Sequence, residues 1–227
     1  MKKVILIAAL LGFFLRPLWG QKEIQVETFD ALLVSGNIQV VLEPGEKEKV
    51  VLYIDGIPED EITVKVSQGT LRLISLNSFL YKNEVIKAYV TYNKLREIRA
   101  NAGSSVSCDT ELQGDQLEAR AGSGAQLRLK VKANALEASA MEGGQLHLEG
   151  TSESLDCTAA TGGQFFGSGL ISKRVYVRAN TGGRAEVHAT ERLEVSANTG
   201  GEIIYHGDPQ TKYVKSILGG EVRQGRI

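Results

Sequence analysis

The sequence predicts an all-β fold, a single-stranded parallel β-helix in which the chain coils into stacked rungs of about 19 residues. From residue 98 to the C-terminus the sequence repeats itself, with turns spaced 19, 19, 19, 20, 18 and 19 residues apart. Within each copy apolar and polar residues alternate with period two, which is typical of strands with one buried face. No helical periodicity of convincing length follows the first twenty residues.

Seven copies of the repeat align on their small residues. Position zero of the copies is Ile98, Leu117, Leu136, Leu155, Val175, Leu193 and Lys212. The turn is predicted seven positions later, at Ser105, Gly124, Gly143, Gly162, Gly182, Gly200 and Gly219. Position four is small throughout, with Ala102, Ala121, Ala140, Ala159, Ala179, Ala197 and Ser216. A second strand begins with an apolar residue at position ten, namely Cys108, Leu127, Leu146, Phe165, Ala185, Ile203 and Val222.

Residues at one position of the repeat are expected to form a column along the coil, because neighbouring rungs stack in parallel. The even positions then make one apolar core, and the alanine column predicts that this side of the coil is narrow. The Gly-Gly pairs are predicted at sharp turns with positive φ, which glycine adopts without strain. Accordingly, Ala140→Leu should lower the unfolding temperature sharply, whereas Glu137→Lys on the outer face should not.

Residues 21–94 are strand-rich but less regular, and we expect them to cap the N-terminal end of the coil, where an open edge needs covering. Two strands are expected around Ser35, Gly36 and Asn37, with others at residues 49–54, 62–66, 70–74 and 85–92. Residues 21–227 are therefore predicted to form a single β-helix domain, with the irregular part at 21–94 and regular rungs at 95–227.

The first twenty residues have the layout of a secretory signal peptide. Lys2 and Lys3 give a basic start, residues 4–15 are apolar, and cleavage is expected near Gly20. The apolar stretch is too short to span a bilayer and no second long one follows, so we predict an exported protein that does not span the membrane. The formal net charge is -1 with both signs mixed, which argues against a nucleic-acid partner.

Cys108 and Cys157 are the only cysteines. The repeat places them in different columns, two or three rungs apart. With rungs stacked at about 4.8 Å, their Cα atoms are expected to be too far apart for a disulfide. Both are predicted to be small buried apolar residues, where a nucleophilic thiolate is disfavoured.

Several segments together carry a family resemblance. They are Phe29-Asp30, the run Val34-Ser35-Gly36-Asn37-Ile38-Gln39-Val40, and the rung turns Ala179-Asn180-Thr181-Gly182-Gly183 and Ala197-Asn198-Thr199-Gly200-Gly201. On these residues the chain resembles the exported Bacteroidetes-type family called putative auto-transporter adhesin, head GIN domain. The resemblance covers nearly all of the chain after the signal peptide. It implies a right-handed β-helix and a surface or envelope role, and it brings no catalytic residues to transfer.

Position one of the repeat carries an outer column of carboxylates, Glu118, Glu137, Asp156 and Glu194. Carboxylates on consecutive rungs, about 5 Å apart, repel one another unless cations intervene. One interpretation is a calcium site, since hard cations take carboxylate oxygens. The other, which we favour, is a solvated face balanced by Arg99, Arg120 and Arg178, of which Arg120 and Arg178 stand at position three. The sequence leaves open whether Glu118, Glu137 and Asp156 bind a cation.

Other polar residues are interpreted as structural. Asn180 and Asn198 occupy equivalent turn positions, where asparagines stack along a coil, and a carbohydrate-contacting strip is the alternative. His188 and His206 are expected to stack on adjacent rungs, and with His147 they lack zinc-like spacing. At the C-terminal edge, Arg223 and Arg226 are expected to guard against strand pairing, and a dimer through this edge is the alternative.

An enzyme of the polysaccharide-active β-helix type needs paired carboxylates, aromatic platforms for sugar rings and a loop at the active face. The rung tyrosines Tyr176, Tyr205 and Tyr213 are expected in different columns or distant rungs, and rung length leaves little room for such a loop. No catalytic, cofactor-binding or metal-ligating residue is assigned, and no cofactor is predicted.

The function predicted from the sequence is that of an exported, non-catalytic binding or adhesion module with a rigid solenoid surface. Its partner would be a protein or glycan at the cell surface or in the periplasm. The alternatives are a structural envelope protein that binds a sibling protein and, less favoured, a polysaccharide-active enzyme.

Overall fold

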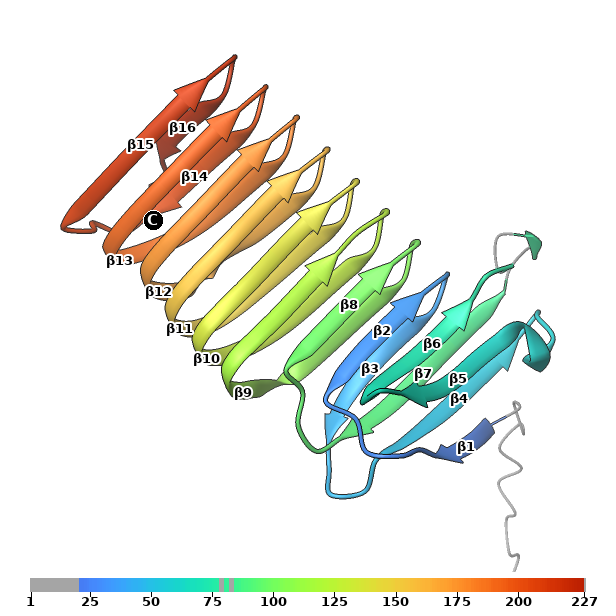
Figure 1. The fold of residues 1–227 in the computed structure, drawn as a ribbon. Coiled ribbons are helices and arrows are strands. Elements are labelled where there is room, and N and C mark those ends of the chain that lie inside the picture. The colour runs from blue at the N-terminus through green and yellow to red at the C-terminus, as the bar shows by residue number, and fades with distance from the viewer. Residues whose placement is uncertain (1–20, 78–79, 82–83, 227) are drawn as a thin grey trace, which may run out of the picture.

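The computed structural model describes residues 21–77, 80–81 and 84–226, so the predicted signal peptide lies outside the described residues. The described residues form a flattened coil of sixteen strands, and a short 3-10 turn, η1 (Glu59–Glu61), lies between β4 and β5. Figure 1 shows the rungs stacked side by side, each with a tight turn at one edge and a wider bend at the other. The predicted all-β parallel β-helix with an irregular N-terminal cap is confirmed. Within the described ranges no helix has the length and apolar character needed to cross a membrane.

The regular rungs are formed by five long strands that run from one tight turn to the next and by shorter strands at the two ends. The long strands are β9 (Ser105–Ala121), β10 (Gln126–Met141), β11 (Gln145–Ala160), β12 (Gln164–Asn180) and β13 (Arg184–Asn198), and the shorter ones are β8 (Glu97–Asn101), β14 (Glu202–His206), β15 (Thr211–Ile217) and β16 (Glu221–Gln224). Neighbouring rungs pair in parallel, so that Leu127, Leu146 and Phe165 face one another in successive rungs. The predicted columns from the second copy onward are confirmed.

The coil has two walls, which we name by their strands. The ladder wall consists of β8, the second halves of β9 to β13 and β15; the opposite wall consists of the first halves of β9 to β13 together with β14 and β16. Side chains at alternate positions point between the walls or out into solvent.

The first copy of the repeat lies two residues out of the predicted register. Ile98 pairs with Ala119 rather than Leu117, and Val106 rather than Cys108 pairs with Leu127. The reason is a bulge in β9, where Asp109 and Thr110 are extra residues between the pairs Cys108–Leu129 and Glu111–Lys130.

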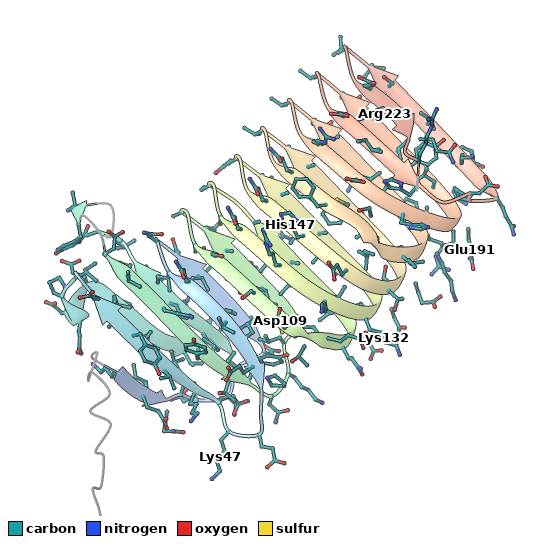
Figure 2. All side chains as sticks on the ribbon, turned by 180° about the vertical axis from the view of Figure 1, so that it is seen from behind. Lys47, Asp109, Lys132, His147, Glu191 and Arg223 are labelled. Carbon is teal, nitrogen blue, oxygen red and sulfur yellow. The ribbon has the colours of Figure 1, made fainter. Side chains whose placement is uncertain are left out.

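The same bulge moves the first turn. This turn lies at Ala102 and Gly103 and not at the predicted Ser105, which is the first residue of β9. Ala102 is therefore an exposed turn residue with a φ of 52°, not a member of the buried alanine column. Figure 2 shows Asp109 at the point where the bulge occurs.

Each tight turn contains two consecutive residues with positive φ, as in a type I′ turn. Thr161 and Gly162, for example, have φ of 51° and 73°, and Gly163 N–H donates to Ala160 O at 2.9 Å to close the turn. The second glycine of each Gly-Gly pair has a different role from the one predicted. Gly163 does not have positive φ, but a Cβ there would approach Ala140 O of the previous rung closer than 3.0 Å. This close contact recurs at Gly144, Gly183, Gly201 and Gly220.

The N-terminal part adds two more rungs and then ends the stack. Strands β2 (Ala31–Ser35) and β3 (Gln39–Pro44) pair in parallel with β8 and β9, and β6 (Thr70–Ser75) and β7 (Val85–Tyr92) pair in parallel with β2 and β3. Antiparallel strands then cover this end, namely β4 (Lys49–Asp55) on β7, β5 (Ile62–Ser67) on β6 and β1 (Gln21–Gln25) on β4. The predicted strands and the predicted capping role are confirmed.

One apolar core runs through the cap and the rungs, from Phe29 to Ile203. The alanine column lies inside it, with Ala140, Ala159 and Ala179 fully buried. Cys108 and Cys157 are buried and free, as predicted. Burial raises the pKa of the Cys157 thiol, so the neutral form is favoured there.

The two glycines of one turn should respond differently to the same substitution. Gly162→Ala should cost only about 1 kcal/mol, because the added Cβ meets no atom within 4 Å and the cost comes from positive φ alone. Gly163→Ala should cost at least about 3 kcal/mol, since a rung must move away from its neighbour. Urea unfolding of the two variants measures the difference, and equal losses would contradict the proposed close contact between rungs.

Candidate functional site: the ladder wall

The ladder wall carries one continuous outer column across seven rungs. The register aligns Glu97, Glu118, Glu137, Asp156, Tyr176, Glu194 and Tyr213. Beside it runs a second column of Arg99, Arg120, Ser139, Thr158, Arg178, Ser196 and Lys215. Because parallel strands lie about 4.8 Å apart, equivalent side chains repeat at that spacing along the coil. The predicted acidic column is confirmed, with Glu97 as an additional member.

Arginines pair with the carboxylates of this column. Arg178 contacts Asp156 at 2.8 Å, and Arg120 contacts both Glu137, at 2.9 Å, and Glu118. Beyond them, Arg99 pairs with Glu97. The predicted balance of this face by Arg99, Arg120 and Arg178 is therefore confirmed.

The C-terminal carboxylate of the column has a partner that the sequence analysis did not name. Glu194 pairs with Arg192, two residues before it on the same strand. Arg192 is at the same time over the Tyr213 ring. In the described part of the chain, no cluster of three or more histidine, cysteine or acidic residues is placed to hold a metal ion.

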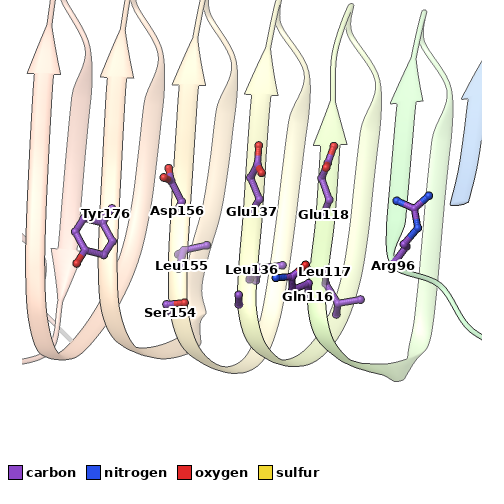
Figure 3. A pocket seen from close by; sticks show the side chains of 11 residues that line it. Arg96, Gln116, Leu117, Glu118, Leu136, Glu137, Ser154, Leu155, Asp156 and Tyr176 are labelled. Carbon is purple, nitrogen blue, oxygen red and sulfur yellow. The ribbon is translucent and has the colours of Figure 1, made fainter. Parts of the chain in front are cut away.

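A shallow groove of about 400 Å³ follows the N-terminal half of the column. Figure 3 shows Glu118, Glu137 and Asp156 side by side on successive rungs, pointing the same way, with Arg96 at one end and Tyr176 at the other. The side chains of Glu137 and Asp156 are 58% and 50% exposed. They are open to solvent and to a ligand along the wall, without an enclosed cavity.

A second groove, of about 460 Å³, follows the C-terminal half of the same wall. Tyr176 and Tyr213 line it, with Glu194 on the rung between them. The expectation that the rung tyrosines lie in different columns or distant rungs is wrong for this pair, which shares one column. Both residues stand at position one of their copies, so aligning that position across all seven copies finds them.

The opposite wall carries the histidines. His147 stacks on Phe166 of the next rung, with ring centroids 4.4 Å apart, and its buried Nε2 has no hydrogen-bond partner among the described residues. Burial, and secondly the charge of Arg128, lower the pKa of His147. His188 and His206 pair on adjacent rungs, as predicted, and His206 Nε2 lies 2.7 Å from Glu186 Oε1.

Two further predictions concern the turn edge and the C-terminal edge. Asn198 Nδ2 donates to Asn180 Oδ1 at 2.9 Å, which confirms the asparagine stack. Arg223 donates to Glu202 of the preceding rung at 2.9 Å, so its charge is paired within the coil. The last rung instead presents Lys212, in the column that holds buried Leu193 in the rung before it.

Comparisons with known proteins agree with this architecture. The family model described as putative auto-transporter adhesin, head GIN domain, matches residues 28–209. A solved structure of a putative adhesin from Bacteroides fragilis is 22% identical with a TM-score of 0.77, covering 90% of this chain and 95% of that chain. The corresponding values for a putative adhesin from Parabacteroides merdae are 20%, 0.67, 91% and 95%.

A third solved structure carries a different description. It is a putative lipid binding protein from Parabacteroides distasonis, 18% identical with a TM-score of 0.62, covering 91% of this chain and 96% of that chain. At these identities the likeness to the solved structures shows the fold alone. The search of proteins with curated function found no match. The family and these neighbours are described as adhesins or as a lipid binding protein, and not as enzymes.

His147 predicts a pH dependence of stability. Its pKa is lower in the folded chain than the usual value near 6.5, so the unfolded chain binds a proton that the folded chain does not. Stability should therefore be full above about pH 7 and should fall as the pH drops through about 6.5. His147→Phe keeps the stacking on Phe166 and should remove this part of the loss. Urea midpoints at about pH 7.5 and about pH 5 measure it, and identical losses in both proteins would contradict the assignment.

Proposed function

Because the chain belongs to the family described as putative auto-transporter adhesin, head GIN domain, we propose that it is an exported, non-catalytic binding and adhesion module. Its working surface in this proposal is the ladder wall. The observation that carries the proposal is the outer column of this wall, which repeats charged and aromatic side chains over seven rungs at a fixed spacing.

The rigidity of the wall supports a binding role. Every rung from β9 to β13 is hydrogen-bonded to the rungs on both sides, and its inner residues belong to one apolar core. A surface held in this way loses little conformational entropy when it binds an extended ligand. Repeat proteins use such walls to hold long partners along several units at once.

The chemistry of the wall supports binding rather than catalysis. Its carboxylates are paired with arginines and its grooves are open, whereas catalytic carboxyl groups commonly lie in enclosed pockets that exclude water. The rungs also lack a long inserted loop among residues 95–226, and such loops commonly carry the active-site residues of enzymes.

Export and action as one unit are parts of the same proposal. The basic and then apolar pattern of residues 1–20 supports export through a cleaved signal peptide. The core that runs from Phe29 to Ile203 supports treating residues 21–227 as one domain.

The alternative is a structural envelope protein that binds a sibling protein. The exposed apolar residues of the last rung favour it, since Val214, Ile217 and Leu218 are 56%, 46% and 78% exposed. A partner strand that covers this edge would bury them.

Binding through the ladder wall can be tested with residues 21–227 on a panel of immobilised glycans and extracellular-matrix proteins. The double variant Glu137→Ala with Tyr176→Ala removes ladder-wall side chains and should weaken binding about tenfold or more. The matched control, Gln145→Ala with Gln164→Ala, changes the opposite wall and should bind like the wild type. Loss in the control alone, or absence of binding to every probe, would contradict the proposed function.

A further inference from the structure

The C-terminal half of the ladder wall has a pair of tyrosines at a regular distance. Tyr176 and Tyr213 stand in one column with the rung of Glu194 between them, so their Cα atoms are two rung spacings, or about 9.6 Å, apart. Tyr213 is 57% exposed and Tyr176 is half-buried. We call the groove that they line, with Arg178, Glu194, Lys212 and Lys215, the tyrosine groove.

Cations dominate the charge of the tyrosine groove. Its lining includes Arg178, Lys212 and Lys215 against a single carboxylate, Glu194, which is already paired with Arg192. Arg178 and Lys212 contact carboxylates that lie outside the lining, Asp156 at 2.8 Å and Asp208 at 3.6 Å. Lys215 is exposed, and within the described chain it has no ion pair.

The N-terminal half of the same wall has the opposite character. There the outer column is a run of carboxylates on four consecutive rungs, from Glu97 to Asp156. The wall therefore changes at Tyr176 from a carboxylate column with matched arginines to an aromatic column beside three cationic side chains, of which Lys215 has no ion pair in the described chain. An anionic ligand would therefore meet exposed, arginine-paired carboxylates along the first half and lysine and arginine side chains along the second.

From this placement we infer that the tyrosine groove binds an acidic polysaccharide, one whose sugar units carry carboxylates, with its chain along the coil axis. The inference rests on the proposed function and names the ligand class of the same wall. The apolar face of a sugar ring packs on an aromatic ring, and carboxylates pair with arginine and lysine at hydrogen-bond distance.

The spacing of the groove fits an extended polysaccharide. Successive rungs are about 4.8 Å apart. An extended polysaccharide whose sugar units advance by a similar distance would place one unit on each rung. Tyr176 and Tyr213 then lie under alternate sugar units. Arg178 and Lys215, each two residues after one of these tyrosines, lie beside them where the sugar carboxylates project.

The charged residues of the last rung favour an accessible tyrosine groove over a dimer formed through the C-terminal edge. Lys212 replaces the apolar residue of its column, and Lys215 adds a second charge on the same strand. Charged residues at inward positions of an edge strand discourage pairing with another strand. The groove that Tyr213 lines is therefore left accessible.

Isothermal titration calorimetry of residues 21–227 tests this inference. The probe is a hexamer of galacturonic acid, and a neutral glucose hexamer serves for comparison. The wild type should bind the acidic hexamer, more weakly at high salt, and should bind the neutral one at least about tenfold less tightly. Tyr213→Ala and Lys215→Gln should each weaken binding about fivefold to tenfold. The matched controls Tyr53→Ala and Lys132→Gln, outside the wall, should leave binding unchanged.

Two measurements distinguish a failure of this inference from a folding defect and from a failure of the proposed function, namely the unfolding temperature of the variants and binding to the glycan and matrix panel. Tyr213 and Lys215 are exposed on the last rung, so both variants should keep the unfolding temperature of the wild type. Equal binding of the neutral hexamer, or unchanged binding in both variants, would overturn the acidic ligand class. If the acidic hexamer does not bind while the glycan and matrix panel shows binding that depends on the ladder wall, only the ligand class fails. If no probe of the panel binds either, the proposed function is also contradicted.

Discussion

The structure depends on how closely consecutive rungs approach at the tight turns. Gly163 lies against Ala140 O of the previous rung, and its equivalents repeat this contact along the coil. The close approach requires backbone strain, because each turn holds a non-glycine residue at positive φ, and at Thr161, Thr181 and Thr199 that residue is β-branched. Backbone hydrogen bonds between turns offset this strain, as where Gly162 N–H donates to Thr181 O at 3.2 Å. The narrow alanine column follows, since larger side chains would not fit beside such turns.

This contact also determines what the outer surface can do. Once the turns fix the stacking, the period of two sends every second side chain outward in register, and equal positions form columns. Arginines one step away from the carboxylates neutralise the first half of the ladder wall. Where Tyr176 and Tyr213 replace carboxylates, the same geometry places two aromatic rings beside Arg178, Lys212 and Lys215 in one groove. A single repeat thus provides two surfaces of different charge.

The columns could be predicted because each copy repeats the same alternation, so that aligning the copies gives the register of the rungs. The exceptions lie where the spacing of the copies changes or where segments do not repeat. The Asp109–Thr110 bulge adds two residues within β9 without interrupting the alternation, so counting back by 19 placed Ile98 two residues out of register. The nesting of β2 and β3 between β6–β7 and β8–β9 depends on pairing between segments that do not repeat. Tyr176 and Tyr213 share the position-one column with the rung of Glu194 between them, so their pairing follows from the sequence only when that position is aligned across all the copies.

The register of the rungs is the central claim, and disulfide trapping on the ladder wall tests it most directly. Glu137 and Asp156 face outward on adjacent rungs, with Cα atoms about 4.8 Å apart, within reach of a disulfide. Glu137 and Glu194 are three rungs apart, about 14 Å. Native Cys108 and Cys157 are buried, so they do not compete. Under mild oxidation, Glu137→Cys with Asp156→Cys should form an intramolecular bond and Glu137→Cys with Glu194→Cys should not. Bond formation in the second pair, or in neither, would contradict the account.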